Sequence, residues 1–226
     1  MDKTDKQRSS FMIGNVLIIG DSYSTYKGWI PEGYAVYYSK EGRGDPEFMV
    51  TKMEVEDTWW MRLINSTDAH LVHNNSWSGS TLCYTGYSGD CSHTSSFIYR
   101  YRLLKEDGFF EKNRIDTVFV FGGTNDSWAN APLGELKYSD IKEEDLFSVL
   151  PAFSYFMKTL KEDLPDARIV FIANCDIKDE IVEGIKCAGE HYGVAVVALS
   201  SVTKEHGHPN VQGMGEICEQ VLRIFK

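Results

Sequence analysis

The chain has 226 residues, of which 42% are hydrophobic and 25% are charged, values typical of a globular protein of about one domain. Its formal net charge of −10, without a cluster of Lys and Arg, argues against nucleic acid or an anionic membrane as the main partner. No apolar run approaches the roughly 20 residues that span a bilayer.

The amino terminus and the cysteines bear on the compartment. Residues 1–10 are polar and lack the apolar stretch of a signal peptide. Five Cys, an odd number without tight pairing, favour free thiols, although Cys83 and Cys91 flank a Gly-rich loop and could pair under oxidising conditions. The sequence as written predicts a cytoplasmic protein. A secreted or periplasmic chain that has lost its signal peptide would look the same.

Short apolar runs alternate along the chain with segments that have the period of an amphipathic helix. Strands are expected at 15–20, 70–74, 117–121, 168–173 and 194–199, and helices at 57–64, 95–106, 144–164, 177–192 and 211–225. Pro151 is expected to bend or split the longest helix. This alternation predicts an α/β fold: one three-layer α/β/α domain over residues 1–226, with a parallel sheet of about five strands.

Two long Gly-rich segments, 23–56 and 76–92, interrupt the alternation. Loops of this length are often functional. Both follow the ends of the first two predicted strands, where open α/β sheets bind ligands. The sequence therefore predicts a site at that edge of the sheet.

Ser22 follows the first predicted strand in the tripeptide Gly20-Asp21-Ser22. A Ser hydroxyl becomes a good nucleophile when a base accepts its proton. His208, on a turn before the last helix, is the best candidate for that base, and His206 ranks below it. The alternatives are that His208 is only a turn residue and that Asp21 only braces the turn around Ser22.

A base of this kind needs a partner that orients its second ring nitrogen. Glu205 lies three residues before His208, so a tight turn could bring its carboxylate to that nitrogen. The alternative is a solvated surface glutamate.

Acyl transfer also needs hydrogen-bond donors for the developing oxyanion. The candidates are the backbone N–H groups of Ser22 and Gly79 and the side-chain amide of Asn125. Gly122-Gly123, before Asn125, would let the backbone approach a ligand closely. Alternatively, the two glycines form a plain strand-to-helix turn, and Asn125 or Asp126 is a helix N-cap.

In this order, Gly20-Asp21-Ser22, Gly79, Gly122-x-x-Asn125 and His208 resemble the four blocks of the SGNH, or GDSL-type, hydrolase superfamily. The longer strings GDSYSTY, WSGST, FGGTNDSW and GHPN are similar to SGNH hydrolases of gut bacteria. The resemblance implies a flavodoxin-like fold and an esterase-type serine mechanism. It assigns Ser22 as nucleophile, His208 as base, and Gly79 and Asn125 as oxyanion donors.

The chain departs from the family pattern at Glu205, where Asp is usual. Glu is one methylene longer and can reach the imidazole with a different rotamer. A Ser–His dyad oriented by a backbone carbonyl would also work, with less stabilisation of the imidazolium. No cofactor is expected. Cys91-x-His93 lacks further ligands nearby, so no metal site is expected either.

The two long loops are rich in aromatic residues. They carry Tyr23, Tyr26, Trp29, Tyr34, Tyr37, Tyr38, Trp77, Tyr84 and Tyr87, and Trp128 follows Asn125. Flat rings with Ser, Thr and Gly neighbours favour a sugar over a lipid. The expected substrate is an acylated carbohydrate or another small polar ester, contacted by Asp21, Tyr23, Trp77 and Trp128. Alternatively, several rings only hold the loops in place; Trp59 and Trp60 are expected in the core.

Two other function classes remain open. A non-catalytic carbohydrate-binding domain could keep the fold with an impaired triad. A nucleotide- or phosphate-binding protein could use Gly122-Gly123 as a phosphate nest, although no Gly-x-Gly-x-x-Gly or Walker pattern supports it. No feature of the sequence indicates an oligomeric state.

Overall fold

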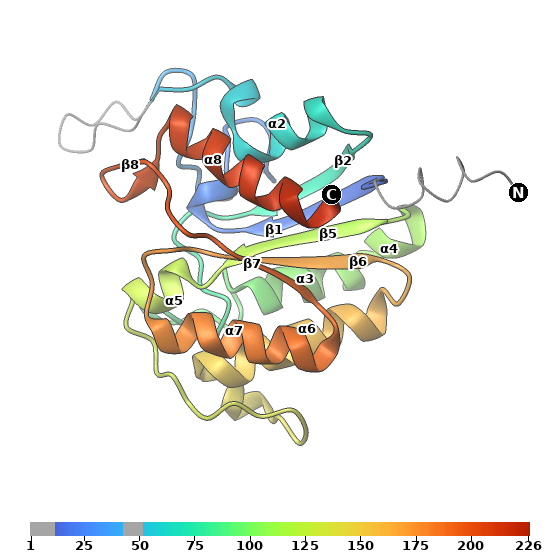
Figure 1. Ribbon diagram of the computed structural model, residues 1–226. Coiled ribbons are helices and arrows are strands. Elements are labelled where there is room, and N and C mark those ends of the chain that lie inside the picture. Colours follow the sequence, from blue (N-terminus) through green and yellow to red (C-terminus); the bar gives the residue numbers. More distant parts are fainter. Residues whose placement is uncertain (1–11, 43–51) are drawn as a thin grey trace, which may run out of the picture.

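Five parallel strands form a central sheet in a computed structural model that describes residues 12–42 and 52–226 (Figure 1). The sheet order is β2-β1-β5-β6-β7. The strands are β1 (Asn15–Gly20), β2 (His70–Ser76), β5 (Thr117–Gly122), β6 (Arg168–Ala173) and β7 (Ala195–Ala198). The predicted α/β fold with a five-stranded parallel sheet is confirmed. Residues 1–11 and 43–51, which include the polar amino terminus and the middle of the predicted loop 23–56, lie outside the described residues.

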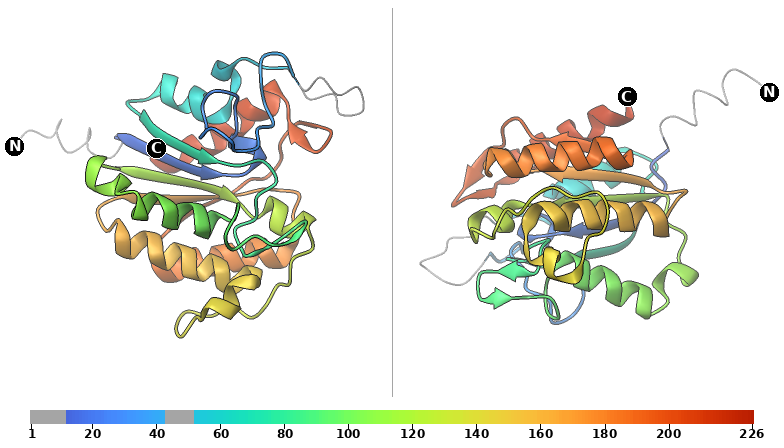
Figure 2. Two further views of the ribbon diagram at one scale, coloured as in Figure 1. Left: turned by 180° about the vertical axis from the view of Figure 1, so that it is seen from behind. Right: turned by 90° about the horizontal axis from the view of Figure 1, so that it is seen from below.

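Helices cover both faces of the sheet (Figures 1 and 2). One face carries α2 (Trp59–Ser66) and α8 (Val211–Leu222), and the other carries α3 (Phe97–Glu106), α6 (Val149–Asp163) and α7 (Asp179–Tyr192). Side chains that alternate along each strand point to opposite faces. Leu17 and Ile19 therefore join one core cluster and Val16 and Ile18 join the other. Trp59 and Trp60 are buried in the core, as expected.

The predicted helix 144–164 is divided into η3 (Glu143–Phe147) and α6, with Ser148 between them. Pro151 stands in the first turn of α6, where its missing N–H costs no helical hydrogen bond. The split was expected at the proline and occurs just before it. The short elements α4 (Phe109–Lys112), α5 (Thr124–Trp128), η1 (Ser22–Ser24), η2 (Val55–Asp57) and η4 (Arg223–Phe225) were not predicted.

Two small antiparallel hairpins were also not predicted. One, β3 (Thr85–Gly86) with β4 (Gly89–Asp90), stands in the loop 76–92. The other, β8 (Lys204–Glu205) with β9 (His208–Pro209), turns at His206 and Gly207. Both turn residues have positive φ, of 49° and 77°, as a two-residue type I′ turn requires.

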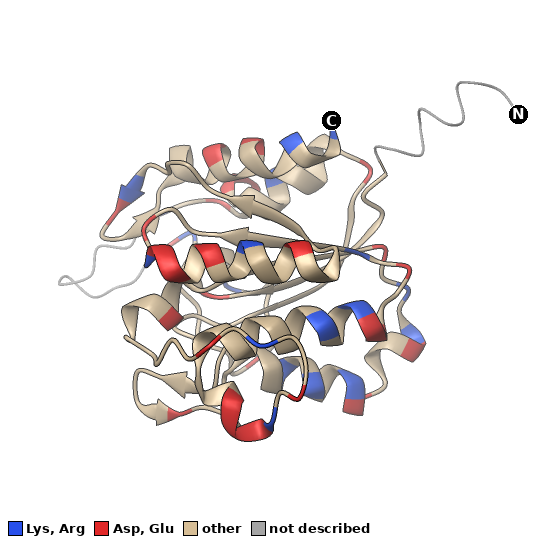
Figure 3. Cartoon of the chain, turned by 60° about the horizontal axis from the view of Figure 1, so that its bottom comes forward, with Lys and Arg blue, Asp and Glu red and all other residues tan. Residues whose placement is uncertain are grey.

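The outer faces of the helices carry charges of both signs (Figure 3). Lys158 pairs with Glu162 on α6, and Lys186 pairs with Glu183 on α7. Such exposed pairs contribute little to stability but keep the surface polar.

In the ranges 12–42 and 52–226, no helix combines the length and apolar character needed to cross a bilayer.

Candidate active site

Ser22 and His208 meet at the carboxyl edge of the sheet, although 186 positions separate them in the sequence. Ser22 begins η1 directly after β1, and His208 begins β9. The Ser22 Oγ and the His208 Nε2 are 2.9 Å apart. This is the distance required for a nucleophile and a general base to exchange a proton.

The sheet order explains why a site forms at this edge. β1 lies between β2 and β5, so the chain leaves β1 toward one neighbour and returns on the other side. Open α/β sheets bind ligands at such switch points. Ser22 follows β1 and Asn125 follows β5, so both residues lie at the carboxyl ends of neighbouring strands.

The loop that carries Ser22 also holds the hairpin that carries His208. The buried Tyr23 donates its hydroxyl to the Gly207 carbonyl at 2.6 Å, and the buried Tyr38 donates to the Pro209 carbonyl at 2.8 Å. The ring of Tyr37 stacks on the imidazole of His208, with centroids 3.6 Å apart and planes 9° apart. These three tyrosines fix the position and the plane of the imidazole.

One group stands near the second nitrogen of His208, and Glu205 lies across the hairpin from the same residue. The Nδ1 atom lies 3.3 Å from the carbonyl oxygen of His206. Glu205 is directly opposite His208 in the β8–β9 register, so both side chains lie on one face of the hairpin. The Oε1 atom of Glu205 also accepts a hydrogen bond from Asn210 Nδ2 at 3.4 Å.

The three candidate oxyanion donors come from three strand ends. Gly79 has φ of +80°, and a Cβ placed on it would meet no atom within 4 Å, so its backbone faces open space. The Nδ2 atom of Asn125 donates to the Ser80 carbonyl at 3.0 Å, and its Oδ1 accepts from the Tyr87 hydroxyl at 3.0 Å. These bonds fix which side of the amide is nitrogen and leave its second N–H for another acceptor.

The proposed N-cap roles of Asn125 and Asp126 are wrong, because Gly123 with φ of 95° is the N-cap of α5. The carboxylate of Asp126 instead accepts the backbone N–H groups of Leu82 and Cys83 at 3.0–3.1 Å. The buried carboxylate thereby anchors the loop 76–92 to the end of β5.

Gly122 has a packing role. A Cβ on Gly122 would lie 2.8 Å from the ring of Phe97, so the backbone of β5 closely approaches helix α3. The close approach was expected to be to a ligand, and at Gly122 it is to a neighbouring helix.

Two of the expected substrate contacts are not supported. Asp21 and Tyr23 are both fully buried, so their side chains lie beneath the site. Trp128 is 40% exposed and Tyr87 is 57% exposed. Trp77 is half-buried and packs against Tyr34, with ring centroids 4.3 Å apart. The accessible aromatic rings on the segments that follow β2 and β5 are therefore Trp77, Tyr87 and Trp128, and the Tyr87 hydroxyl contacts Asn125.

Some loop aromatics do hold the loops in place, as the alternative reading expected. Tyr26, Tyr38 and Tyr84 are buried, and the Tyr84 hydroxyl donates to Glu143 Oε1 at 2.8 Å.

Cys83 and Cys91 are free, buried thiols, and burial raises the pKa of both. Within the described ranges, no group of three or more His, Cys, Asp or Glu side chains could hold a metal ion.

Sequence analysis missed the buried polar residues that support the site. Asn174, directly after β6, donates from Nδ2 to the Tyr23 hydroxyl at 3.2 Å and accepts at Oδ1 from Lys204 at 2.9 Å. Arg100, in α3, is fully buried beneath the ends of β1 and β2. Neither residue belongs to a recognisable motif, so no local signal could have found it.

Asp21 is the N-cap of η1, where its Oδ1 accepts the N–H of Tyr23 at 3.0 Å. Its Oδ2 has no hydrogen-bond partner among the described residues. Burial raises the pKa of Asp21 from 3.8 to about 7, against the opposing effects of the Tyr23 N–H, the Thr124 hydroxyl and Arg100. The carboxyl therefore gains its charge in the folded protein near neutral pH.

This pKa predicts a pH-dependent stability cost that Asp21→Asn removes. Between pH 3.8 and about 7 the unfolded state is ionised at residue 21 while the folded state keeps its proton, so stability falls as pH rises and then levels off. In urea unfolding, the free energy of unfolding of the variant should rise relative to that of the wild type across this window, by on the order of 4 kcal/mol in total. The exposed Asp166→Asn is the control. A difference independent of pH would show that Asp21 is already ionised.

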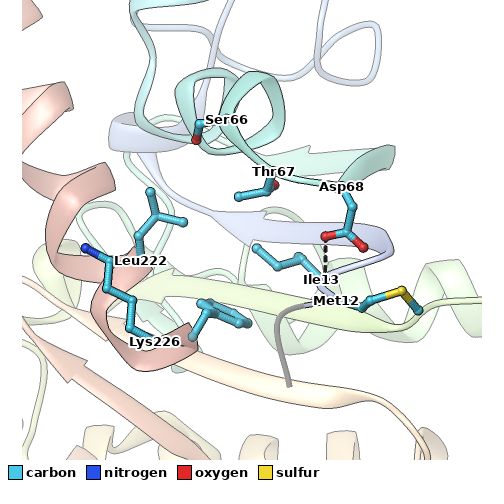
Figure 4. A pocket seen from close by; sticks show the side chains of 8 residues that line it. Met12, Ile13, Ser66, Thr67, Asp68, Leu222 and Lys226 are labelled. Atoms are coloured by element: carbon cyan, nitrogen blue, oxygen red, sulfur yellow. Dashed lines mark hydrogen bonds between the residues drawn. The ribbon is translucent and has the colours of Figure 1, made fainter. Parts of the chain in front are cut away.

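An apolar cavity of about 510 Å³ lies away from this site (Figure 4). Its lining comes from the residues before β1, the end of α2 and the end of the chain: Met12, Ile13, Ser66, Thr67, Asp68, Leu222, Phe225 and Lys226. The backbone N–H of Ile13 donates to Asp68 Oδ1 at 3.0 Å beside it. Ile13 precedes β1 and Asp68 precedes β2, so the cavity lies at the amino-terminal ends of these strands, opposite Ser22.

The five-stranded sheet, with a Ser–His pair at its switch point, has the architecture of the GDSL-type hydrolases. Residues 14–225 match the family of GDSL-like lipases and acylhydrolases, and the chain belongs to this family. It is therefore an ester hydrolase. Among curated proteins, none matches the chain in sequence.

Two solved structures are similar over nearly the whole chain. A candidate GDSL-like lipase from Bacteroides uniformis is 40% identical, with a TM-score of 0.82 over 92% of this chain and 93% of that one. Another from Bacteroides ovatus is 34% identical, with a TM-score of 0.82 over 93% and 96%. A family two carbohydrate esterase from Cellvibrio japonicus shares the fold at 17% identity, with a TM-score of 0.63 over 93% of this chain and 61% of that one.

Proposed function

We propose that the protein is a serine esterase that forms an acyl-enzyme on Ser22 and deacylates a carbohydrate or another small polar ester. The observation that carries the proposal is the 2.9 Å contact between Ser22 Oγ and His208 Nε2. The contact joins a hydroxyl at a strand end to a base whose plane is fixed by Tyr37.

In the first half-reaction, Ser22 Oγ attacks the ester carbonyl carbon as His208 Nε2 accepts the hydroxyl proton. The carbonyl oxygen becomes an oxyanion that the N–H groups of Ser22 and Gly79 and the free N–H of Asn125 stabilise. The intermediate collapses, and the alcohol leaves with the proton from Nε2. In the second half-reaction, His208 takes a proton from water as the water oxygen attacks the acyl carbon; the bond from that carbon to Ser22 Oγ then breaks, Oγ receives the proton from Nε2, and the carboxylic acid leaves.

The imidazole must present Nε2 unprotonated to Ser22, which requires a proton on Nδ1. We assign the orienting role to Glu205, because it lies across the hairpin from His208. The His206 carbonyl, 3.3 Å from Nδ1, is the second acceptor that could hold this tautomer. A carboxylate would stabilise the imidazolium more than a carbonyl does.

The accessible surface beside Asn125 supports a polar, ring-shaped substrate. Trp128, Tyr87 and Trp77 offer flat rings, and Gly79 leaves open space between the strand ends. Flat aromatic rings with polar edges suit the faces of a sugar. The carbohydrate esterase from Cellvibrio japonicus has the same fold, which is compatible with this substrate class.

A fluorophosphonate probe followed by peptide mass spectrometry tests the mechanism. The probe should label Ser22 in the folded protein and fail to label a heat-denatured sample, because only an activated Ser attacks the phosphorus. Labelling at another residue, or none in a folded sample, would refute the acyl-Ser22 mechanism. Sugar binding without labelling would favour the non-catalytic carbohydrate-binding alternative.

A further inference from the structure

Arg100 is a fully buried cation beneath the candidate active site. It lies on α3, which begins after the N-cap Ser96. Within residues 12–42 and 52–226, no carboxylate lies at ion-pair distance from it; its hydrogen-bond partners are oxygens of the backbone, an amide and a hydroxyl. A buried charge is costly unless its hydrogen bonds are satisfied, so this position is a strong constraint on the fold.

The guanidinium uses all three of its nitrogen atoms. Nε donates to the Ser95 carbonyl at 2.9 Å. Nη1 donates to the backbone carbonyl of Asn75 and, at 3.0 Å, to its Oδ1. Nη2 donates to the Gly20 carbonyl at 3.2 Å and to Ser80 Oγ at 3.1 Å. Burial lowers the pKa of Arg100 to about 10, so the group remains protonated at neutral pH.

The two acceptors of Nη2, Gly20 and Ser80, belong to the segments that carry the candidate oxyanion donors. Gly20 lies two residues before Ser22 at the end of β1. Ser80 directly follows Gly79, and the Ser80 carbonyl accepts the amide of Asn125. The backbone N–H of Trp77 also donates to the Gly20 carbonyl at 3.0 Å, so β1 and the loop after β2 share this acceptor with Arg100.

The plane of the guanidinium is fixed by packing. Its central carbon lies 4.8 Å from the ring centroid of Phe97, and the same ring contacts Gly122 at the end of β5. Arg100 is thus held between the ends of β1 and β2 and an aromatic ring that packs on β5.

We propose that Arg100 is the positioning residue of the oxyanion hole: its planar fork fixes the Ser22 and Gly79 segments directly and the Asn125 amide through Ser80. This inference rests on the proposed acyl-Ser22 mechanism. A lysine has three donors on one nitrogen, so it cannot reach the separate acceptors that Nε, Nη1 and Nη2 of the planar guanidinium bind. Arg100→Lys therefore keeps the charge and loses the positioning.

The test compares Arg100→Lys and Ser80→Ala with the wild type in the hydrolysis of p-nitrophenyl acetate. Ser80→Ala removes one acceptor of the guanidinium and keeps the backbone carbonyl that Asn125 uses. We expect kcat to fall about 10²-fold in Arg100→Lys and about tenfold in Ser80→Ala, with KM within about twofold of the wild type, because the lost contacts act on the transition state. The rate of fluorophosphonate labelling of Ser22 should fall in parallel.

Arg102→Lys is the matched control, since Arg102 lies two residues further along α3 and pairs with Glu143 at the surface. It should keep the wild-type kcat. The double variant should lose little more activity than Arg100→Lys alone, because both substitutions break the same contact, the hydrogen bond between Arg100 Nη2 and Ser80 Oγ. If Arg100→Lys does not fold, the kcat and the labelling rate of Ser80→Ala alone test the positioning role.

The failures of the two proposals are distinguishable. If Ser22 labels at the wild-type rate in folded Ser80→Ala and Arg100→Lys, the positioning role is wrong and the acyl-Ser22 mechanism stands. If KM rises while kcat holds, Arg100 shapes substrate binding and the positioning role is also wrong. If the wild type itself does not label at Ser22, both proposals are overturned.

Discussion

Ser22→Ala is expected to lower kcat for p-nitrophenyl acetate by about 10⁶-fold, the size of loss measured when a catalytic serine is removed from a serine hydrolase. The variant keeps the backbone of η1, because the N-cap bond from Tyr23 N to Asp21 does not involve the Ser22 side chain. Thermal unfolding should therefore stay close to that of the wild type.

Ser24→Ala is the matched control for this experiment. Ser24 lies two residues from Ser22 in the same 3₁₀ helix, and its hydroxyl accepts the indole N–H of Trp59 at 3.2 Å. This variant should lose about 1 kcal/mol of stability and keep its turnover. Full activity in Ser22→Ala would show that another residue is the nucleophile. Inactivity of both variants would indicate damage to η1.

Glu205→Gln is expected to lower kcat by about 10⁴-fold if the carboxylate orients His208, as for a triad carboxylate in other serine hydrolases. The amide retains an oxygen that can accept from Asn210, so the hairpin should keep its shape. Glu205→Asp should recover part of the activity, because it restores the charge on a shorter side chain. Burst-phase kinetics with p-nitrophenyl acetate separate the effect on acylation from the effect on deacylation.

The exposed Glu219→Gln on α8 is the control for a change of net charge. Near-wild-type turnover in Glu205→Gln would remove Glu205 from the triad. The His206 carbonyl, 3.3 Å from Nδ1, would then be the orienting group, and the chain would work as a Ser–His dyad.

The layers of the fold could be predicted because its signals are local. Strands β1, β5, β6 and β7 are short runs of mostly apolar residues, and each long flanking helix carries its own periodic stripe. The small hairpins were missed because a pair of two-residue strands has no period. The His206-Gly207 turn lacks the Asn-Gly or Asp-Gly pair that usually marks a type I′ turn.

The candidate site could be predicted in part, because its reacting groups lie in short motifs at strand ends. Ser22 and His208 meet as their order in the chain implied. The burial of Tyr23 and Asp21 could not be predicted, since burial at a strand end depends on which distant loop covers it. Arg100 could not be found either, because its acceptors on Gly20, Asn75 and Ser80 lie in segments 20 or more residues away, and two of them are backbone carbonyls, which every residue type has.

Catalytic competence and global folding are separate properties of this molecule. His208, the proposed base, lies on a hairpin of two-residue strands, and Tyr23 and Tyr38 bind this hairpin to the rest of the protein through two hydroxyl–carbonyl hydrogen bonds. Such an element can open locally at a lower free energy than the sheet. Inactivation by mild denaturant would then report the undocking of this hairpin, while circular dichroism would report the later loss of the sheet.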